Sequence, residues 1–123
     1  MKNLFDLTGK VAIVTGASSG MGRAIAEALG ANGAEVILSS NDIEGLKSTF
    51  DDFQNKRIYC LSVYCDMSKR EDIDVLYKKS VENFGNVDIL VNCVGIATSG
   101  GLFDIKADIF ERVMLVNLQA LFI

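Results

Sequence analysis

The stretch Thr15-Gly16-Ala17-Ser18-Ser19-Gly20-Met21-Gly22 decides how this 123-residue chain folds. It follows the apolar run 11–15, which is typical of a strand buried on both faces, and it opens a segment with helical periodicity. Gly16 permits a sharp exit from the strand, Gly20 lets a phosphate approach the backbone, and Gly22 lets the helix pack closely. The free N–H groups at the start of such a helix favour an anion. The turn therefore predicts a phosphate-binding site.

Ser18 and Ser19 add two hydroxyls that can donate hydrogen bonds to phosphate oxygens. The glycine spacing is G-x-x-x-G-x-G, which differs from the common dinucleotide pattern G-x-G-x-x-G. A tight strand-to-helix connection without a ligand is the alternative interpretation. The position of the turn, directly after the first strand and before the first helix, favours phosphate binding.

Buried strands and amphipathic helices alternate along the whole chain. Strands are expected at 11–15, 35–39, 57–64 and 87–92, and helices at 20–32, 42–53, 68–84 and from residue 107. Ser68 and Glu71 form a capping box at the start of the third helix. The helical faces expected to point inward carry Ile25, Ala28, Leu29, Ile43, Leu46, Phe50, Ile73, Leu76, Tyr77, Val81, Phe84, Ile109, Val113, Val116 and Ala120.

This order predicts an α/β fold in which helices cover both faces of a Rossmann-type parallel sheet. Residues 1–123 are expected to form one dinucleotide-binding domain, which is incomplete after its fourth strand and the helix that follows. The fourth strand would then be a bare apolar edge, open to pairing with another chain.

Composition excludes several classes of function. A net charge of −4 argues against nucleic acid as a partner, and no apolar run approaches the ~20 residues that span a bilayer. The N-terminus lacks the apolar segment of a secretory signal. Cys60, Cys65 and Cys93 fit no zinc spacing, so we expect no metal, reduced thiols and a cytoplasmic protein; Cys60 and Cys65 are expected to be buried.

Five segments in the right order resemble the short-chain dehydrogenase/reductase family. The resemblance rests on the lead-in 7–16, the complete T-G-x-x-x-G-x-G motif at 15–22, the turn 65–68, the segment 88–95 and the helical segment 116–118. Segment 88–95 is similar to the family's D-x-L-V-N-N-A-G motif, in which Cys93 and Val94 replace Asn and Ala. The resemblance implies a Rossmann-type NAD(P)-dependent oxidoreductase that transfers hydride between alcohols and carbonyls.

The resemblance also implies which residues act. Asp66 would accept a hydrogen bond from the adenine amino group, and Asn117 would be the family's catalytic Asn, which supports a lysine through water. The implied cofactor-binding residues are Gly16, Ser18, Ser19, Gly20, Met21, Gly22, Ser40, Asn41, Asp66, Met67, Asn92, Val94 and Gly95. Taken singly, Asp66 could be a turn residue, Asn92 a strand-end polar group and Asn117 a residue on a helix face.

The end of the second strand carries no diagnostic residue for NAD or NADP. An acidic residue there would bind the ribose 2′-hydroxyl, and an arginine would bind a 2′-phosphate. These positions are Ser40 and Asn41, and Ser19 stands where some NADP-binding members carry a basic residue. Ser40 weakly favours NADP because it does not repel a 2′-phosphate, whereas the carboxylate of Asp42 favours NAD. The expected cofactor is therefore NAD(P).

The family's catalytic pair Y-x-x-x-K is absent, because Tyr59, Tyr64 and Tyr77 are not followed four residues later by lysine. In the family, the catalytic Ser, Tyr and Lys follow the fifth strand, which would lie after Ile123. We therefore expect the chain alone to be inactive. Two explanations fit this absence: a fragment of a full-length, homo-oligomeric reductase, which the retained Asn117 favours, and a non-catalytic nucleotide- or partner-binding module. For the full-length form, the resemblance implies a small-molecule carbonyl or alcohol substrate.

Overall fold

The computed structural model describes residues 3–101 and 103–123. Four strands and four α-helices alternate, and a short 3-10 helix closes the chain. The elements are β1 (Val11–Thr15), α1 (Gly20–Ala31), β2 (Glu35–Ser40), α2 (Ile43–Asn55), β3 (Cys60–Tyr64), α3 (Arg70–Phe84), β4 (Ile89–Asn92), α4 (Ala107–Asn117) and η1 (Gln119–Phe122).

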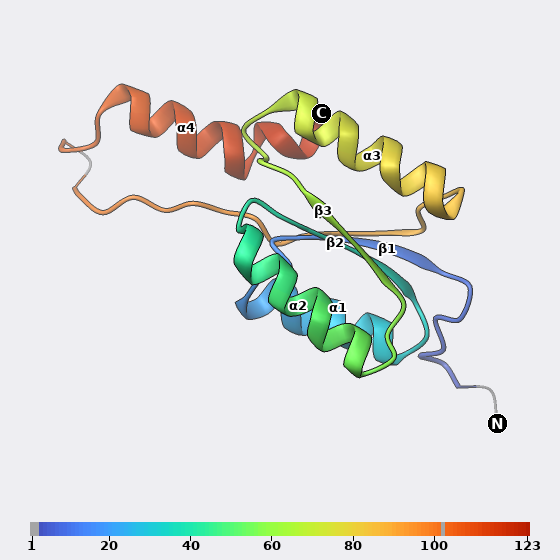
Figure 1. The fold of residues 1–123 in the computed structure, drawn as a ribbon. Coiled ribbons are helices and arrows are strands. Elements are labelled where there is room, and N and C mark those ends of the chain that lie inside the picture. Colours follow the sequence, from blue (N-terminus) through green and yellow to red (C-terminus); the bar gives the residue numbers. More distant parts are fainter. Residues whose placement is uncertain (1–2, 102) are drawn as a thin grey trace.

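The four strands form a single parallel sheet in the order β3-β2-β1-β4. Figure 1 shows α1 and α2 on one face of the sheet and α3 and α4 on the other. Each face has its own apolar core, one built around Phe53 and the other around Ile37 and Val63. The predicted α/β fold of Rossmann type, with helices on both faces, is confirmed.

The inner faces of the helices differ in part from those expected. Ala28 is exposed, and the side chains of Ile43 and Tyr77 are each about two-thirds exposed, at 65%. On α2 the fully buried positions are instead Thr49 and Phe53. The buried stripe of α2 is therefore set by the residues that lie over the sheet, and Ile43, the first residue of the helix, falls outside it.

The predicted capping box is wrong. Helix α3 begins at Arg70, one residue after its N-cap Lys69, and that cap makes no side-chain hydrogen bond. The Ser68 hydroxyl donates to Asp66 Oδ1 at 2.7 Å. The Asp66 amide donates to Asp72 Oδ2 at 2.9 Å. The Ser68 hydroxyl thus bonds the nearby Asp66 carboxylate instead of capping the helix as the pattern predicts.

Two polar side chains tie β4 to β1. Asp88 Oδ2 accepts from the Val11 amide at 2.9 Å at the start of the two strands. At their carboxyl ends, the Thr15 hydroxyl donates to the Val91 carbonyl at 3.4 Å and accepts from the Cys93 amide at 3.1 Å. These bonds fix where the chain leaves β4, next to the glycine-rich turn.

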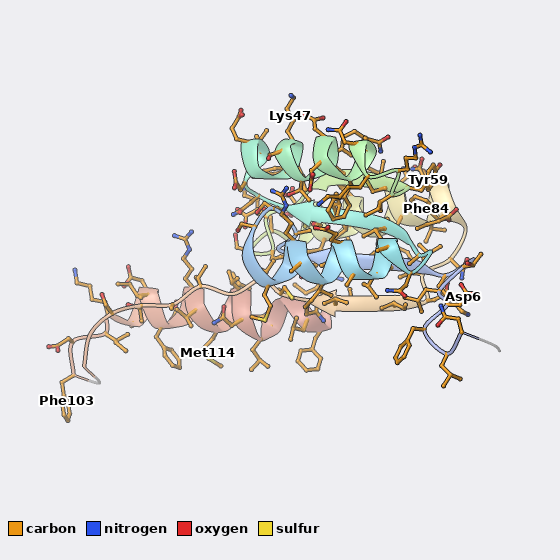
Figure 2. All side chains as sticks on the ribbon, turned by 90° about the horizontal axis from the view of Figure 1, so that it is seen from below. Asp6, Lys47, Tyr59, Phe84, Phe103 and Met114 are labelled. Atoms are coloured by element: carbon orange, nitrogen blue, oxygen red, sulfur yellow. The ribbon has the colours of Figure 1, made fainter. Side chains whose placement is uncertain are left out.

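The surface of the described residues retains large apolar groups. Leu90 of β4 is 58% exposed, and β4 pairs only with β1 among the described strands, as the prediction of a bare apolar edge requires. Figure 2 shows Phe103 and Met114 standing clear of the sheet on the side of α4. At the far edge, Tyr59 and Phe84 meet edge to face, with ring centroids 5.9 Å apart, and so join the start of β3 to the end of α3.

Candidate functional site

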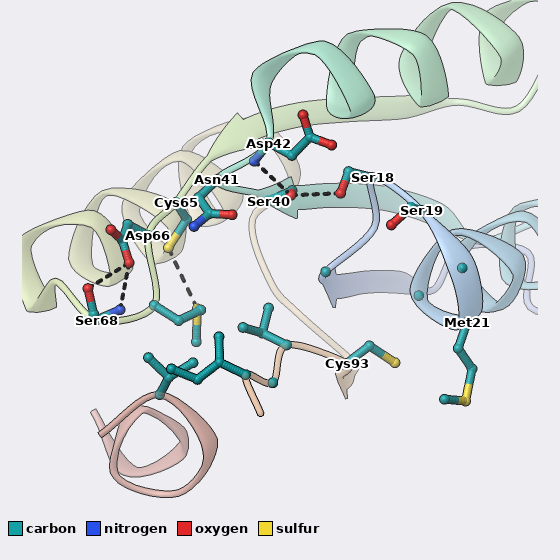
Figure 3. A pocket seen from close by; sticks show the side chains of 18 of the residues that line it. Ser18, Ser19, Met21, Ser40, Asn41, Asp42, Cys65, Asp66, Ser68 and Cys93 are labelled. Atoms are coloured by element: carbon teal, nitrogen blue, oxygen red, sulfur yellow. Dashed lines mark hydrogen bonds between the residues drawn. The ribbon is translucent and has the colours of Figure 1, made fainter. Parts of the chain in front are cut away.

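A cavity of about 480 Å³ opens at the carboxyl ends of the strands. In an open parallel sheet, ligands bind in this position, where neighbouring connections leave to opposite faces. Figure 3 shows how the turns after β1, β2 and β3 surround it. Its walls are formed by Gly16, Ser18, Ser19, Gly20, Met21, Gly22, Ser40, Asn41, Asp42, Cys65, Asp66, Met67, Ser68, Cys93, Val94, Gly95, Ile96, Arg112 and Val116.

The glycine-rich turn needs its glycines for space and for backbone conformation. Gly16 and Gly20 have φ angles of +70° and +54°, in the left-handed region that side chains disfavour. A Cβ on Gly22 would collide with the carbonyl oxygen of Gly16, so only glycine lets α1 start this close to β1. A Cβ on Gly20 would meet nothing within 4 Å, because that side faces the open cavity. The N-terminus of α1 therefore points into open space.

No side chain caps the N-terminus of α1 among the described residues. Its N-cap is Ser19, whose side chain makes no capping hydrogen bond, and the first turn carries no acidic residue. The Arg23 amide already donates to the Ser19 carbonyl at 3.2 Å. The amides before Arg23 and the Ser19 hydroxyl remain able to donate to an anion, and the helix dipole favours one there.

Hydrogen bonds join the end of β2 to the glycine-rich turn. The Ser40 hydroxyl donates to Ser18 Oγ at 2.9 Å and accepts from the Asp42 amide at 3.1 Å, as Figure 3 shows. Ser40 is only 5% exposed. Asp42 is the N-cap of α2, and its Oδ1 accepts from the Gly45 amide at 3.0 Å. Ser40 is thus committed to the protein, and Asp42 holds a fixed negative charge on the cavity wall.

Asp66 lies at the other end of the cavity. Its Oδ1 accepts from both the Ser68 hydroxyl, at 2.7 Å, and the Ser68 amide, at 2.9 Å. These bonds, hydroxyl first, hold the pKa of the Asp66 carboxyl below its ordinary value, and the charges of Lys69 and Arg112 add to the effect. The carboxylate is therefore ionised at neutral pH, and its second oxygen can accept from a ligand.

Asn117 holds the segment after β4 against α4. Its Oδ1 accepts from the Ile96 amide and its Nδ2 donates to the Ile96 carbonyl, each at 2.8 Å. Helix α4 ends at this residue. The carboxamide is therefore fully engaged with backbone 21 residues away in sequence. In this structure Asn117 positions the wall that carries Gly95 and Ile96.

The cavity gathers every cofactor-binding residue predicted from the sequence except Asn92. Asn92 instead lines a second, mainly apolar cavity of about 330 Å³ beside α3 and η1. Asn117 lines neither cavity but bonds a residue that lines the first. The cavity also contains residues that were not among the predicted site residues, namely Asp42, Cys65, Ser68, Cys93, Ile96, Arg112 and Val116.

Some of these residues could have been found from the sequence. Ser68 follows the predicted Asp66 by two residues, and Asp42 directly follows Asn41. Arg112 stands one helical turn before Val116, which is the only signal that both share a face. Cys65 is buried, and burial raises the pKa of its thiol to about 11, so it acts as an apolar wall. Cys60 is buried too, as predicted.

A parallel β-α sheet with a glycine-rich turn opening into a cavity at its carboxyl edge defines a Rossmann-type dinucleotide-binding architecture. The short chain dehydrogenase family matches residues 10–123. The chain belongs to this family.

Relatives and solved structures support this family assignment. The chain is 36% identical over 119 residues to versicolorin reductase stcU of Emericella nidulans, covering 96% of this chain and 45% of that protein. It is 34% identical to an uncharacterized oxidoreductase of Staphylococcus haemolyticus, covering 94% of this chain and 49% of that protein. The chain thus spans about half the length of the curated relatives it matches.

A dehydrogenase/reductase from Sinorhizobium meliloti superposes with a TM-score of 0.91 at 34% identity, covering 96% of this chain and 47% of that one. An actinorhodin polyketide ketoreductase, crystallised with NADPH, superposes with a TM-score of 0.88 at 33% identity, covering 92% and 43%. Within residues 3–101 and 103–123, no helix is both long and apolar enough to cross a membrane.

Proposed function

We propose that residues 1–123 form the dinucleotide-binding unit of an NAD(P)-dependent oxidoreductase that interconverts an alcohol and a carbonyl compound. The observation that carries the proposal is the cavity at the carboxyl edge of the sheet, into which the uncapped N-terminus of α1 opens. Neutral hydroxyls and backbone amides at this point suit a pyrophosphate. The walls formed by Met67, Val94 and Val116 offer apolar surface to a base.

The cofactor roles follow the family pattern. Gly16, Gly20 and Gly22 would shape the turn, and Ser18, Ser19 and Met21 would lie along phosphate and ribose. Asp66 would accept from adenine beside Met67, while Asn92, Val94 and Gly95 would pass under the ribose. Ser40 and Asn41 offer no carboxylate at the end of β2, which supports tolerance of a 2′-phosphate and a lean to NADP.

The hydride-transfer step needs the family's Ser, Tyr and Lys, of which none is recognisable in this sequence. We propose that they belong to a longer, homo-oligomeric form and that the 123-residue chain binds cofactor without turnover. Asn117 would then support the lysine as the family's catalytic Asn. Three free cysteines are consistent with the proposed cytoplasmic location. A nucleotide- or partner-binding module without chemistry remains the second candidate.

Gly20 provides the direct test, because a side chain there has free space and the left-handed φ is tolerated by Asn and Asp. Titration of NADH and NADPH by nucleotide fluorescence should show binding to the unchanged chain. Gly20→Asp should abolish it by placing a carboxylate at the pyrophosphate position, while Gly20→Asn, its uncharged match, should weaken it less. Equal affinities for the two variants would contradict phosphate binding at this turn.

Turnover and the reading frame separate the two candidate functions. The purified chain should not oxidise NADPH with a panel of carbonyl compounds, and robust oxidation would overturn the predicted inactivity. Transcript sequencing beyond the codon for Ile123 should reveal a fifth strand, a serine and Y-x-x-x-K. An immediate stop codon in the native transcript would favour the binding module.

A further inference from the structure

Arg112 is the only basic side chain among the described residues that line the 480 Å³ cavity. It stands on α4 one turn before the buried Val116, and both residues face the cavity. Its guanidinium forms no hydrogen bond or ion pair within residues 3–101 and 103–123, which leaves all its donors and its planar face available to a ligand.

The position of Arg112 is away from the phosphate-binding turn. Figure 3 shows Ser19 and Met21 at one end of the cavity and Asp66 with Ser68 at the other. Arg112 is close enough to Asp66 to contribute, after the Ser68 hydrogen bonds, to the lowered pKa of that carboxyl. Together with Ile96 it also borders a neighbouring cavity of about 280 Å³ between α4 and the segment after β4. Arg112 therefore lies on the rim of the cavity at the Asp66 end.

We propose that Arg112 is a positioning residue for the cofactor, whose guanidinium plane packs against the face of the adenine ring while Asp66 accepts from its edge. The proposal rests on the proposed function, because adenine is assigned to the Asp66 end through it. A guanidinium is planar and weakly hydrated and stacks readily on aromatic rings. The N-terminus of α1 already serves the pyrophosphate at the opposite end, so the charge of Arg112 is not needed there.

Three variants and two ligands test this role. The variants are Arg112→Ala, Arg112→Lys and, as a control for the loss of one positive charge, Lys79→Ala on the exposed side of α3. The ligands are NADH and its hypoxanthine analogue, in which an oxygen replaces the adenine amino group. Affinities come from calorimetric or fluorescence titration of the whole chain, and thermal unfolding by circular dichroism reports whether each variant folds.

Arg112→Ala should weaken both ligands by about fivefold to tenfold and to the same extent, since stacking does not depend on the amino group. Arg112→Lys should recover little of this loss, because lysine keeps the charge without the planar face. Lys79→Ala should bind as the unchanged chain does.

Three results would overturn the role of Arg112 while leaving the proposed function intact. The first is an affinity of Arg112→Ala within twofold of that of the unchanged chain. The second is a loss of affinity for NADH but not for the hypoxanthine analogue, which would mean that Arg112 acts through Asp66. The third is full recovery of the affinity in Arg112→Lys. Failure of the folded, unchanged chain to bind either ligand would instead overturn the proposed function and this proposal with it.

Discussion

The substitution Asp42→Asn should raise the affinity of the chain for NADPH relative to NADH. Asp42 lines the cavity directly after Ser40 and Asn41, the two residues that we propose lie beside the ribose 2′-group. Its carboxylate is held in place because Oδ1 caps α2 through the Gly45 amide at 3.0 Å. Swinging away from a phosphate would uncap the helix, at a cost of about 1 kcal/mol.

The size of the effect follows from the charges. A 2′-phosphate carries about −2 at neutral pH. If roughly 8 Å of solvent separates the two groups, a single carboxylate repels this phosphate by about 1 kcal/mol, which corresponds to about fivefold in affinity. Asn removes this charge while remaining a good N-cap, so the start of α2 is preserved. The affinity for NADH, which has no 2′-phosphate, should change by less than about twofold.

The assay is a pair of fluorescence titrations, with NADH and NADPH, at low and high salt. Asp51→Asn is the matched control, since Asp51 lies on the same helix, pairs with Lys47 and does not line the cavity. The gain for NADPH should shrink as salt rises, because screening weakens the repulsion. An unchanged NADPH-to-NADH ratio in folded Asp42→Asn protein, or an equal gain in the control, would refute the placement of Asp42 beside the 2′-position.

Three further outcomes are expected. Gly22→Ala should cost about 1–3 kcal/mol in urea unfolding, because its Cβ collides with a backbone oxygen of the turn. Asp88→Asn should be less stable than the unchanged chain at pH 7, with the difference shrinking below about pH 4, since the Val11 amide lowers the pKa of the Asp88 carboxyl and that contribution is lost as the pH falls through it. Asn117→Ala should accelerate hydrogen exchange at the Ile96 amide, which loses its acceptor.

The fold could be predicted because its signals are local. The apolar run of β1 is buried at every position, and the glycine-rich turn starts α1 at Gly20 as expected. The predictions were wrong where the residues that lie close in space determine the hydrogen-bond partner or the burial of a side chain. The Ser68 hydroxyl bonds Asp66 rather than a helix amide, and Ile43 is exposed at the first position of α2. Neither outcome is encoded in the periodicity of one segment.

The site was predictable to the extent that its residues lie within contiguous motifs. The turns 15–22 and 65–68 carry most of the cavity wall, and both were recognised as segments. Arg112 belongs to no motif and reaches the cavity only because α4 packs beside the segment after β4. The hydrogen bonds between Asn117 and the backbone of Ile96 join residues 21 positions apart, so no local sequence pattern predicts them.

The replacement of the family's Asn by Cys93 can be understood from how this wall is held. The Cys93 amide, not its side chain, donates to Thr15 Oγ1 at 3.1 Å, and the Cys93 carbonyl lies where a Cβ on Gly16 would approach to 2.9 Å. The side chain itself faces Gly22, whose Cβ would meet it at 3.2 Å. The backbone of Cys93 holds this segment, and Gly22 has no side chain that would occupy the space beside Cys93. The Cys93 thiol therefore fits without disturbing the glycine-rich turn. The same geometry means that the glycine-rich turn and the end of β4 constrain each other, so a side chain added at Gly16 or Gly22 should displace both segments.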